Sequence, residues 1–223
     1  MGYPEDEGVS EVVGFICILA LIAVVLSIWS AGVPAGVLHR EQNRAAAAAV
    51  QVSDLKLAMD MQWITGTAGT SRTVMVDSGT LCIGNSDVVV RITTNESVTD
   101  YVPLRISYAS GFLYAENVLL SIDAGAVVLE TGGFRSMILP PSVDEPRRQL
   151  TLPVLAAPAA EISATDPVAV TFWVEQIREQ HFTNATLAVS GDSLLQKPFE
   201  QAFDCTEQYN LTVREVHYSV AVS

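Results

Sequence analysis

The stretch EDEGVSEVVGFICILALIAVVLSIW, from Glu5 to Trp29, decides how the first part of the chain is interpreted. Carboxylates crowd its start, and no charged residue occurs between Val12 and Leu38. A helix needs about 20 apolar residues to cross the hydrocarbon core of a membrane. Trp29 suits a membrane interface, and Pro34, flanked by glycines, predicts a kink. We therefore expect a hydrophobic transmembrane or filament-core helix over residues 9–38, kinked near Pro34.

Three kinds of protein begin with such a segment. The first is a cleaved secretory protein, but the apolar stretch exceeds the usual 7–15 residues and no lysine or arginine precedes it. The second is a plain single-pass anchor. The third is a precursor that is cut before the apolar segment, so that the segment stays in the mature protein.

The motif EGVSEVVGFI, residues 7–16, resembles the N-terminus of archaeal type IV pilin-like proteins with a class III signal peptide. The resemblance implies a leader over residues 1–8, which a prepilin peptidase would cut between Gly8 and Val9. A second stretch, residues 104–142, resembles the β-rich domain of uncharacterised pilin-like proteins from methanogenic archaea. The resemblance implies a subunit of a cell-surface filament or adhesion structure that assembles with like subunits.

Glu11 fits this interpretation on physical grounds. A cut after Gly8 would create an ammonium group at Val9, and a lone charge is costly in a helix bundle without water. The Glu11 carboxylate of a neighbouring subunit could pair with that ammonium and fix the register of assembly. Alternatively, Glu11 is an ordinary charge near a helix N-terminus, where a negative charge is favourable.

An amphipathic helix is predicted over residues 39–66. Ala45 to Ala49 are strong helix formers, and glycines follow the segment. Apolar residues recur at spacings of four and seven, which predicts a stripe that packs against the chain's own β-rich domain. The predicted stripe consists of Ala46, Val50, Leu57 and Ile64, and it is partly widened by Ala49, Met61 and Trp63. The alternative is a juxtamembrane linker helix with no filament.

Residues 67–223 are predicted to form an extracellular β-rich domain. Short runs rich in β-branched residues alternate with turn signals at intervals of roughly ten residues. The runs are RTVMVD, VVVRITT, PLRISYA, NVLLSID, GAVVLET, VAVTFWV, ATLAVSG and LTVREVHYSVAVS. A helix is predicted over residues 193–203, and an irregular loop over the proline-rich residues 140–165. The predicted fold class is α+β: a long hydrophobic helix, then an antiparallel β-sandwich-like domain.

The orientation in the membrane has two conflicting signals. Lysine and arginine occur only after the apolar segment, so the positive-inside rule favours a cytoplasmic location for the C-terminal domain. Three glycosylation sequons begin at Asn95, Asn184 and Asn210, and these would matter only outside the cell. We expect a single-pass membrane protein with its C-terminal domain outside, because the pilin-like motif outweighs a bias of a few charges.

Composition excludes several classes of function. The formal net charge is −13, so the chain lacks the basic surface that nucleic-acid binding requires. Cys82 and Cys205 could form a disulfide in an extracellular domain, or both could remain free thiols. No cysteine or histidine spacing is typical of a metal site.

No catalytic motif is present either. The sequence has no nucleophile elbow, phosphate-binding loop or dinucleotide fingerprint, and DAG at residues 123–125 indicates a hairpin turn. We expect no enzyme activity and no cofactor. The alternative to a filament subunit is a membrane-anchored surface protein whose β domain binds a ligand or polysaccharide without polymerising.

Overall fold

A computed structural model describes residues 6–65, 71–76, 79–112, 115–156, 160–164, 168–203 and 207–222. The chain divides into two compact units. The first contains residues up to Asn43 together with residues 113–115, and the second contains residues 44–112 and 116–223. Helix α1 (Asp6–Ile64) contributes residues to both units, and each unit is described by itself below.

Helix α1 is helical without interruption from Asp6 to Ile64 and therefore continues through Pro34. We expected a hydrophobic helix kinked near Pro34, but α1 is not interrupted there. One proline removes a single backbone hydrogen bond, and the turns on either side can maintain the helix. Among the residues that the structure describes, no helix is long and apolar enough to cross a membrane.

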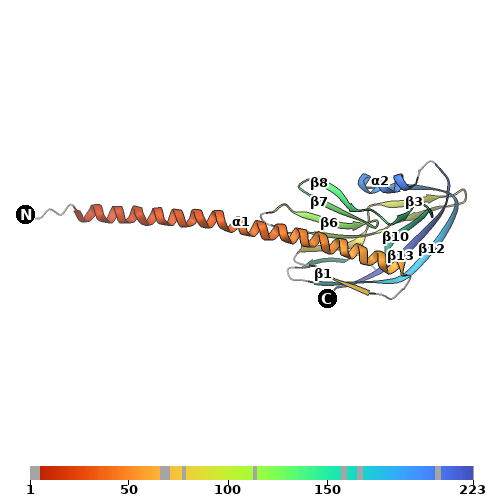
Figure 1. Cartoon of the computed structure of the whole chain (residues 1–223), viewed down its shortest axis with the longest axis horizontal. Coiled ribbons are helices and arrows are strands. Elements are labelled where there is room, and N and C mark those ends of the chain that lie inside the picture. The colour runs from red at the N-terminus through yellow and green to blue at the C-terminus, as the bar shows by residue number, and fades with distance from the viewer. Residues whose placement is uncertain are drawn as a thin grey trace, which may run out of the picture. The chain divides into compact units, whose positions relative to one another are not determined.

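The second unit contains a seven-stranded and a six-stranded sheet (Figure 1). The larger sheet has the order β4-β3-β12-β13-β10-β9, and β1 also pairs with β12. Its strands are β1 (Ser71–Val76), β3 (Val89–Thr93), β4 (Val98–Tyr101), β9 (Val143–Asp144), β10 (Gln149–Leu155), β12 (Val168–Ser190) and β13 (Tyr209–Val222). All of its pairs are antiparallel except β10 with β13, which is parallel.

The smaller sheet is antiparallel throughout and has the order β11-β2-β5-β6-β7-β8. Its strands are β2 (Gly79–Asn85), β5 (Leu104–Ala109), β6 (Val118–Asp123), β7 (Ala126–Thr131), β8 (Phe134–Leu139) and β11 (Ala160–Ala164). The predicted hairpin turn at DAG is confirmed. It joins β6 to β7, with Ala124 and Gly125 at φ of 48° and 79°.

The core of the second unit forms two clusters. One combines α1 side chains such as Leu55 and Met59 with residues of both sheets, including Leu120 and Phe172. The other joins both sheets to α2 (Ser193–Ala202), whose Phe199 is fully buried. The helix predicted over residues 193–203 is thus confirmed, and Asp192 caps it by accepting the Leu194 N–H at 2.9 Å.

The proline-rich stretch at residues 140–165 is not an irregular loop, because it contains β9, β10 and β11. Strand β10 accommodates Pro153 for a physical reason. Thr151 donates its N–H to the carbonyl of Ser142, which directly precedes β9. Backbone nitrogens two residues apart in a strand point to the same side, so the nitrogen of Pro153 also faces β9. Strand β9 pairs only with Gln149 and Leu150, so a missing N–H at Pro153 breaks no ladder bond.

The predicted fold class is therefore wrong. The chain is β-rich with two sheets, one of which is mixed. The β domain does not form an antiparallel sandwich separate from the helix, because α1 residues 44–64 contribute side chains to a core shared with both sheets. A kinked hydrophobic helix is not observed in the described residues. Parallel pairing of β10 and β13 depends on contacts 63 residues apart at Gln149 and Thr212, which local patterns do not reveal.

Candidate functional site

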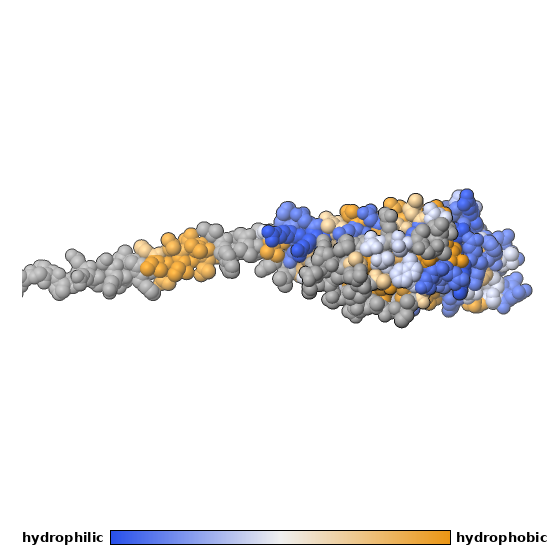
Figure 2. Space-filling model, turned by 90° about the horizontal axis from the view of Figure 1, so that it is seen from below, coloured by the Kyte–Doolittle hydropathy of each residue, from blue (hydrophilic) through white to orange (hydrophobic). Residues whose placement is uncertain are grey.

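Residues 17–27 of α1 form the largest exposed apolar surface of the first unit whose side chains are described. All eleven side chains are exposed, and Leu21 is 67% exposed. Figure 2 shows this segment as a continuous hydrophobic band. Ser27 is its one hydroxyl residue, and its Oγ donates to the carbonyl of Ala23 at 2.7 Å. The segment therefore presents apolar surface on every side, and its single hydroxyl is satisfied within the helix.

Residues 44–64 of α1 have two apolar faces. One is buried in the core of the second unit and contains Ala48, Leu55 and Met59. The other is exposed and contains Val50, Leu57, Met61 and Ile64, each more than half exposed. All four belong to the stripe that we expected to pack against the β domain, so that expectation is wrong for them. Of the residues that widen the stripe, Ala49 and Trp63 do pack against the core. The exposed residues are spaced by seven, four and three positions, which is the spacing of a helix–helix seam.

A buried polar cluster fixes the inner face of this helix segment. Lys56 is only 4% exposed. Its ammonium group forms an ion pair with Asp60 and donates to Ser142 Oγ at 2.9 Å. Ser142 Oγ donates in turn to the other oxygen of Asp60 at 3.1 Å. The Tyr218 hydroxyl donates to the carbonyl of Met59 at 2.9 Å, and burial, then the Asp60 charge, raises the pKa of Tyr218. The cluster ties α1 to Ser142, which directly precedes β9, and to Tyr218 of β13.

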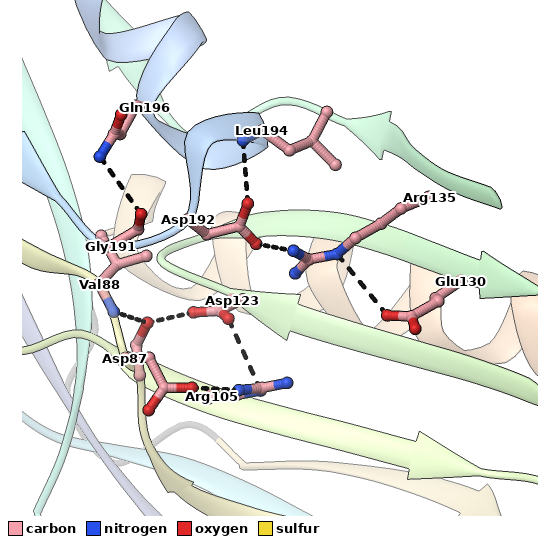
Figure 3. Close-up of polar contacts among 11 residues, drawn as sticks. Asp87, Val88, Arg105, Asp123, Glu130, Arg135, Gly191, Asp192, Leu194 and Gln196 are labelled. Carbon is pink, nitrogen blue, oxygen red and sulfur yellow. Dashed lines mark hydrogen bonds and ion pairs between the residues drawn. The ribbon is translucent and has the colours of Figure 1, made fainter. Parts of the chain in front are cut away.

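A second polar cluster lies where the ends of both sheets meet α2 (Figure 3). Ser86 Oγ donates to Asp123, accepts the Val88 N–H at 2.9 Å, and so links β2's end to the β6–β7 turn. Arg105 binds Asp87 at 2.8 Å through Nη1 and approaches Asp123 at 3.6 Å through Nε. Asp123 is only 2% exposed. Burial raises the pKa of Asp123, although the Ser86 hydrogen bond and the Arg105 charge oppose that shift.

The neighbouring half of the cluster is centred on Arg135. Its guanidinium pairs with Asp192, the residue that caps α2, and its Nε lies 3.8 Å from Glu130. Every acidic group here therefore has an arginine, hydroxyl or backbone partner, as Figure 3 shows. We interpret the cluster as a structural junction. Among the described residues, no group of three or more histidine, cysteine or acidic side chains could hold a metal ion.

The predicted processing and assembly residues, Gly8, Val9 and Glu11, lie on α1, and their side chains are outside the described part of the structure. Cys82 is exposed on β2, whereas Cys205 lies outside the described residues, so the proposed disulfide stays a prediction. The three sequon asparagines, Asn95, Asn184 and Asn210, are all exposed.

Sequence patterns did not predict the polar cluster around Asp123. Its members are spread from Ser86 to Asp192 and come from separate loops and strands. The only sequence signal was the turn at residues 123–125, which indicates a hairpin but not the partners of Asp123. The exposed face of α1 was visible as an apolar stripe, but its direction was assigned wrongly.

Comparison with known proteins places the chain in a family. A family model described as "Family of unknown function (DUF7289)" matches residues 7–218. The chain belongs to this family. The DUF7289 match begins within α1 and ends within β13, so the helix and both sheets are parts of one family unit. No curated protein matches the chain, and no solved structure does.

Proposed function

We propose that this chain is an archaeal type IV pilin-like subunit of a cell-surface filament, assembled through the exposed apolar surface of α1. The observation that carries the proposal is the surface of residues 17–27, where an all-round apolar helix is exposed. A helix that is apolar on every side is normally buried by other protein or by lipid. We infer that the same segment of other copies covers it.

Two features favour copies of this chain as the occupant. Ala20 and Ala23 are small residues, which allow helices to approach closely. Ser27 needs no partner from water, because its hydroxyl already bonds to Ala23. Both features suit a dry bundle of like helices.

The outer face of residues 44–64 supports the same proposal. Val50, Leu57, Met61 and Ile64 follow the spacing of a helix–helix seam and are exposed, although the opposite face of the helix is already buried. A helix that served only to support its own β domain would gain nothing from four large apolar residues on its outer face. A second contact between subunits explains them.

Processing would create the assembly-competent form. A prepilin peptidase would cut between Gly8 and Val9, and the new ammonium of Val9 would pair with Glu11 of a neighbouring subunit. The pair would remove two lone charges from the bundle, where each alone is costly. The domain formed by the two sheets would lie outside the cell.

The second candidate is a membrane-anchored surface protein that binds a polysaccharide without polymerising. An open cleft of about 340 Å³ favours it, because Trp63 lies there with Arg147, Gln149 and Arg214. An aromatic face combined with side-chain donors is a common way to hold a sugar ring. However, Arg214 already stacks on Trp63, with its guanidinium carbon 5.5 Å from the ring centre, and also pairs with Glu179.

The deciding experiment is expression of the full chain in an archaeal host that has a prepilin peptidase. Mass spectrometry would give the mature N-terminus, and sedimentation with electron microscopy of the surface fraction would detect filaments. We expect a start at Val9 and filaments. A start at Met1 or Gly2 with monomeric protein would support the anchored surface protein, and a start near Gly36 would indicate ordinary secretion.

Glu11→Ala tests the charge pair. The variant should be cut normally but should enter filaments at least tenfold less. Glu7→Ala is the matched control, because Glu7 lies in the leader and should leave with it. Equal assembly of both variants would remove the pairing role of Glu11.

A further inference from the structure

The two sheets of the second unit differ in the strands that form their edges. One side of the seven-stranded sheet ends in β9, which has only two residues, and the adjoining part of β10 carries Pro153, which has no N–H. The six-stranded sheet ends in β8, with six residues, and in β11, with five. Among the strands that the structure describes, only the six-stranded sheet therefore has a long edge on both sides.

Strand β8 has few of the features that normally keep an edge strand from pairing. Those features are proline, charged side chains and short length. The single charged residue of β8 is Arg135, and its guanidinium is already held by Asp192. Phe134 and Ile138 are 81% and 40% exposed, and Figure 1 shows β8 on the outside of β6 and β7. An exposed, apolar edge of this length can accept a further strand.

The directions of the two edge strands decide how copies of the chain can join. Every neighbouring pair in the six-stranded sheet is antiparallel, so β8 and β11 run in opposite directions. A second copy in the same orientation therefore brings its β11 antiparallel to β8. Antiparallel pairing of β8 with another β8 would instead require one copy to be turned end over end. A filament repeats one operation and keeps its copies in one orientation, which requires a head-to-tail contact.

The two edge strands also have complementary charges. Each contains one charged residue, Arg135 in β8 and Glu161 in β11. An antiparallel alignment of these two positions places residue 134 opposite residue 162. The alignment uses the regular part of β8, because the bulge in its pairing with β7 comes after Met137. Opposite charges at facing positions stabilise a pair of strands.

This alignment also matches the two faces of the sheet. Phe134 pairs with a residue of β7 that pairs with Val118 of β6. Position 162 is connected in the same way, through β2 and β5, to Leu120 of β6. Val118 and Leu120 are two residues apart in one strand, so positions 134 and 162 belong to the same face of the sheet. A β8–β11 contact in this register would therefore continue the existing sheet without exchanging its faces.

We propose that β8 of one copy binds β11 of the next copy, so that the six-stranded sheets of neighbouring subunits join into one sheet. This inference rests on the proposed function, because it assumes like copies in one orientation. The contact would satisfy backbone groups on edges that have no strand partner within the described part of one chain, and it would cover Phe134. The sheet would then provide a contact between subunits that is separate from the contacts of α1.

The first test is cross-linking of the full chain in material from the cell surface. Phe134→Cys and Ile162→Cys are combined in one chain, and a short bifunctional maleimide is added. Within one chain the two positions are five strand spacings apart along the sheet, about 24 Å, so a short reagent would join only different copies. We expect a ladder of dimers, trimers and longer products, in which peptide mass spectrometry identifies the 134–162 link. Neither single variant should give that link.

Each other outcome rejects a defined part of the proposal. A 134–134 link in place of the 134–162 link would show that β8 pairs with itself and would overturn the head-to-tail contact. Filaments without the 134–162 link reject only the strand contact. Absence of both the filaments and the link rejects the proposed function as well, whereas the link without filaments keeps the strand contact and rejects assembly through α1.

Phe134→Lys tests the same edge without engineered cysteines. Lysine on an edge strand opposes the addition of another strand, so sedimenting material should fall at least tenfold. The urea midpoint should stay unchanged, because the Phe134 side chain is exposed. Val98→Lys is the matched control, because Val98 is an exposed apolar residue on β4, an edge strand of the other sheet. Equal assembly of the two variants would overturn the strand contact, even where filaments form.

Discussion

Two segments of helix α1 show how differently apolar residues can be used. Residues 17–27 are exposed on every side. Residues 44–64 bury one face in a core shared with two sheets and expose another. The first segment is apolar apart from Ser27, whereas the second is amphipathic and includes a buried ion pair, Lys56 with Asp60. We propose that other molecules bury the first segment, whereas one face of the second segment is buried within the second unit itself.

The largest expected effect is on assembly through the exposed residues 17–27. Leu21→Asp would place a carboxylate in the apolar surface of residues 17–27, at a cost of about 3 kcal/mol per subunit in a dry environment. Assembly measured by sedimentation should fall by roughly 100-fold. Leu21→Met is the matched control and should assemble normally. If Leu21→Asp assembles like the control, residues 17–27 are not the contact surface.

The next effect distinguishes the two faces of residues 44–64. Leu55 is 5% exposed and Leu57 is 59% exposed, so the same substitution can be compared two positions apart. Leu55→Ala should lower the free energy of unfolding of the second unit by about 3 kcal/mol. Leu57→Ala should change it by less than about 0.5 kcal/mol but weaken assembly. Urea denaturation of the full chain measures the first quantity. Equal losses of stability would show that the outer face is buried in the monomer.

The buried ion pair should have a smaller effect. Lys56→Ala leaves Asp60 and Ser142 without their cationic partner, and we expect a loss of about 2 kcal/mol. The value is discounted because the Asp60 side chain is 26% exposed and partly screened by water. Lys56→Met, which keeps the apolar stem, should lose less, and Lys197→Ala on the exposed side of α2 should lose almost nothing. Urea midpoints of the three variants provide the measurement.

The smallest expected effect is the change of unfolding free energy with pH that Asp123 causes in the second polar cluster. Burial raises the pKa of Asp123, so the folded chain holds this proton more tightly than the unfolded chain does. The contribution of Asp123 to stability is complete below the ordinary carboxyl range near pH 4 and declines as pH rises toward the raised pKa. Asp123→Asn should remove that decline. Unfolding free energies of both proteins at several pH values above 4 would test this, and parallel curves would contradict it.

Much of the local structure could be predicted from the sequence. The apolar run, most of the central strands, α2 and the turn after Asp123 follow from periodicity and turn residues. Strand β10 could not be predicted, because a proline and its neighbours indicate a loop until β13 is known to pair with it. The parallel pair, and with it the class of the fold, depends on contacts between distant parts of the chain.

The candidate surfaces were predicted only in part. The sequence revealed a stripe at Val50, Leu57 and Ile64 but could not show that Leu55 and Met59 would occupy the core instead. Three separate sequons were visible, but the hydrogen bond from the Asn184 N–H to Asn210 Oδ1 was not, because it requires the pairing of β12 with β13. The partners of Asp123 were hidden for the same reason.

The sequence by itself determined where the chain is apolar, where many of its strands lie and where its three sequons stand, because each property depends on neighbouring residues. Only the tertiary structure decided which face of α1 is buried, which strands run parallel and which asparagines are neighbours. These depend on strand register and on competition between helix faces for one core. Periodicity shows that two faces exist, but the shape of the partner surface selects one of them.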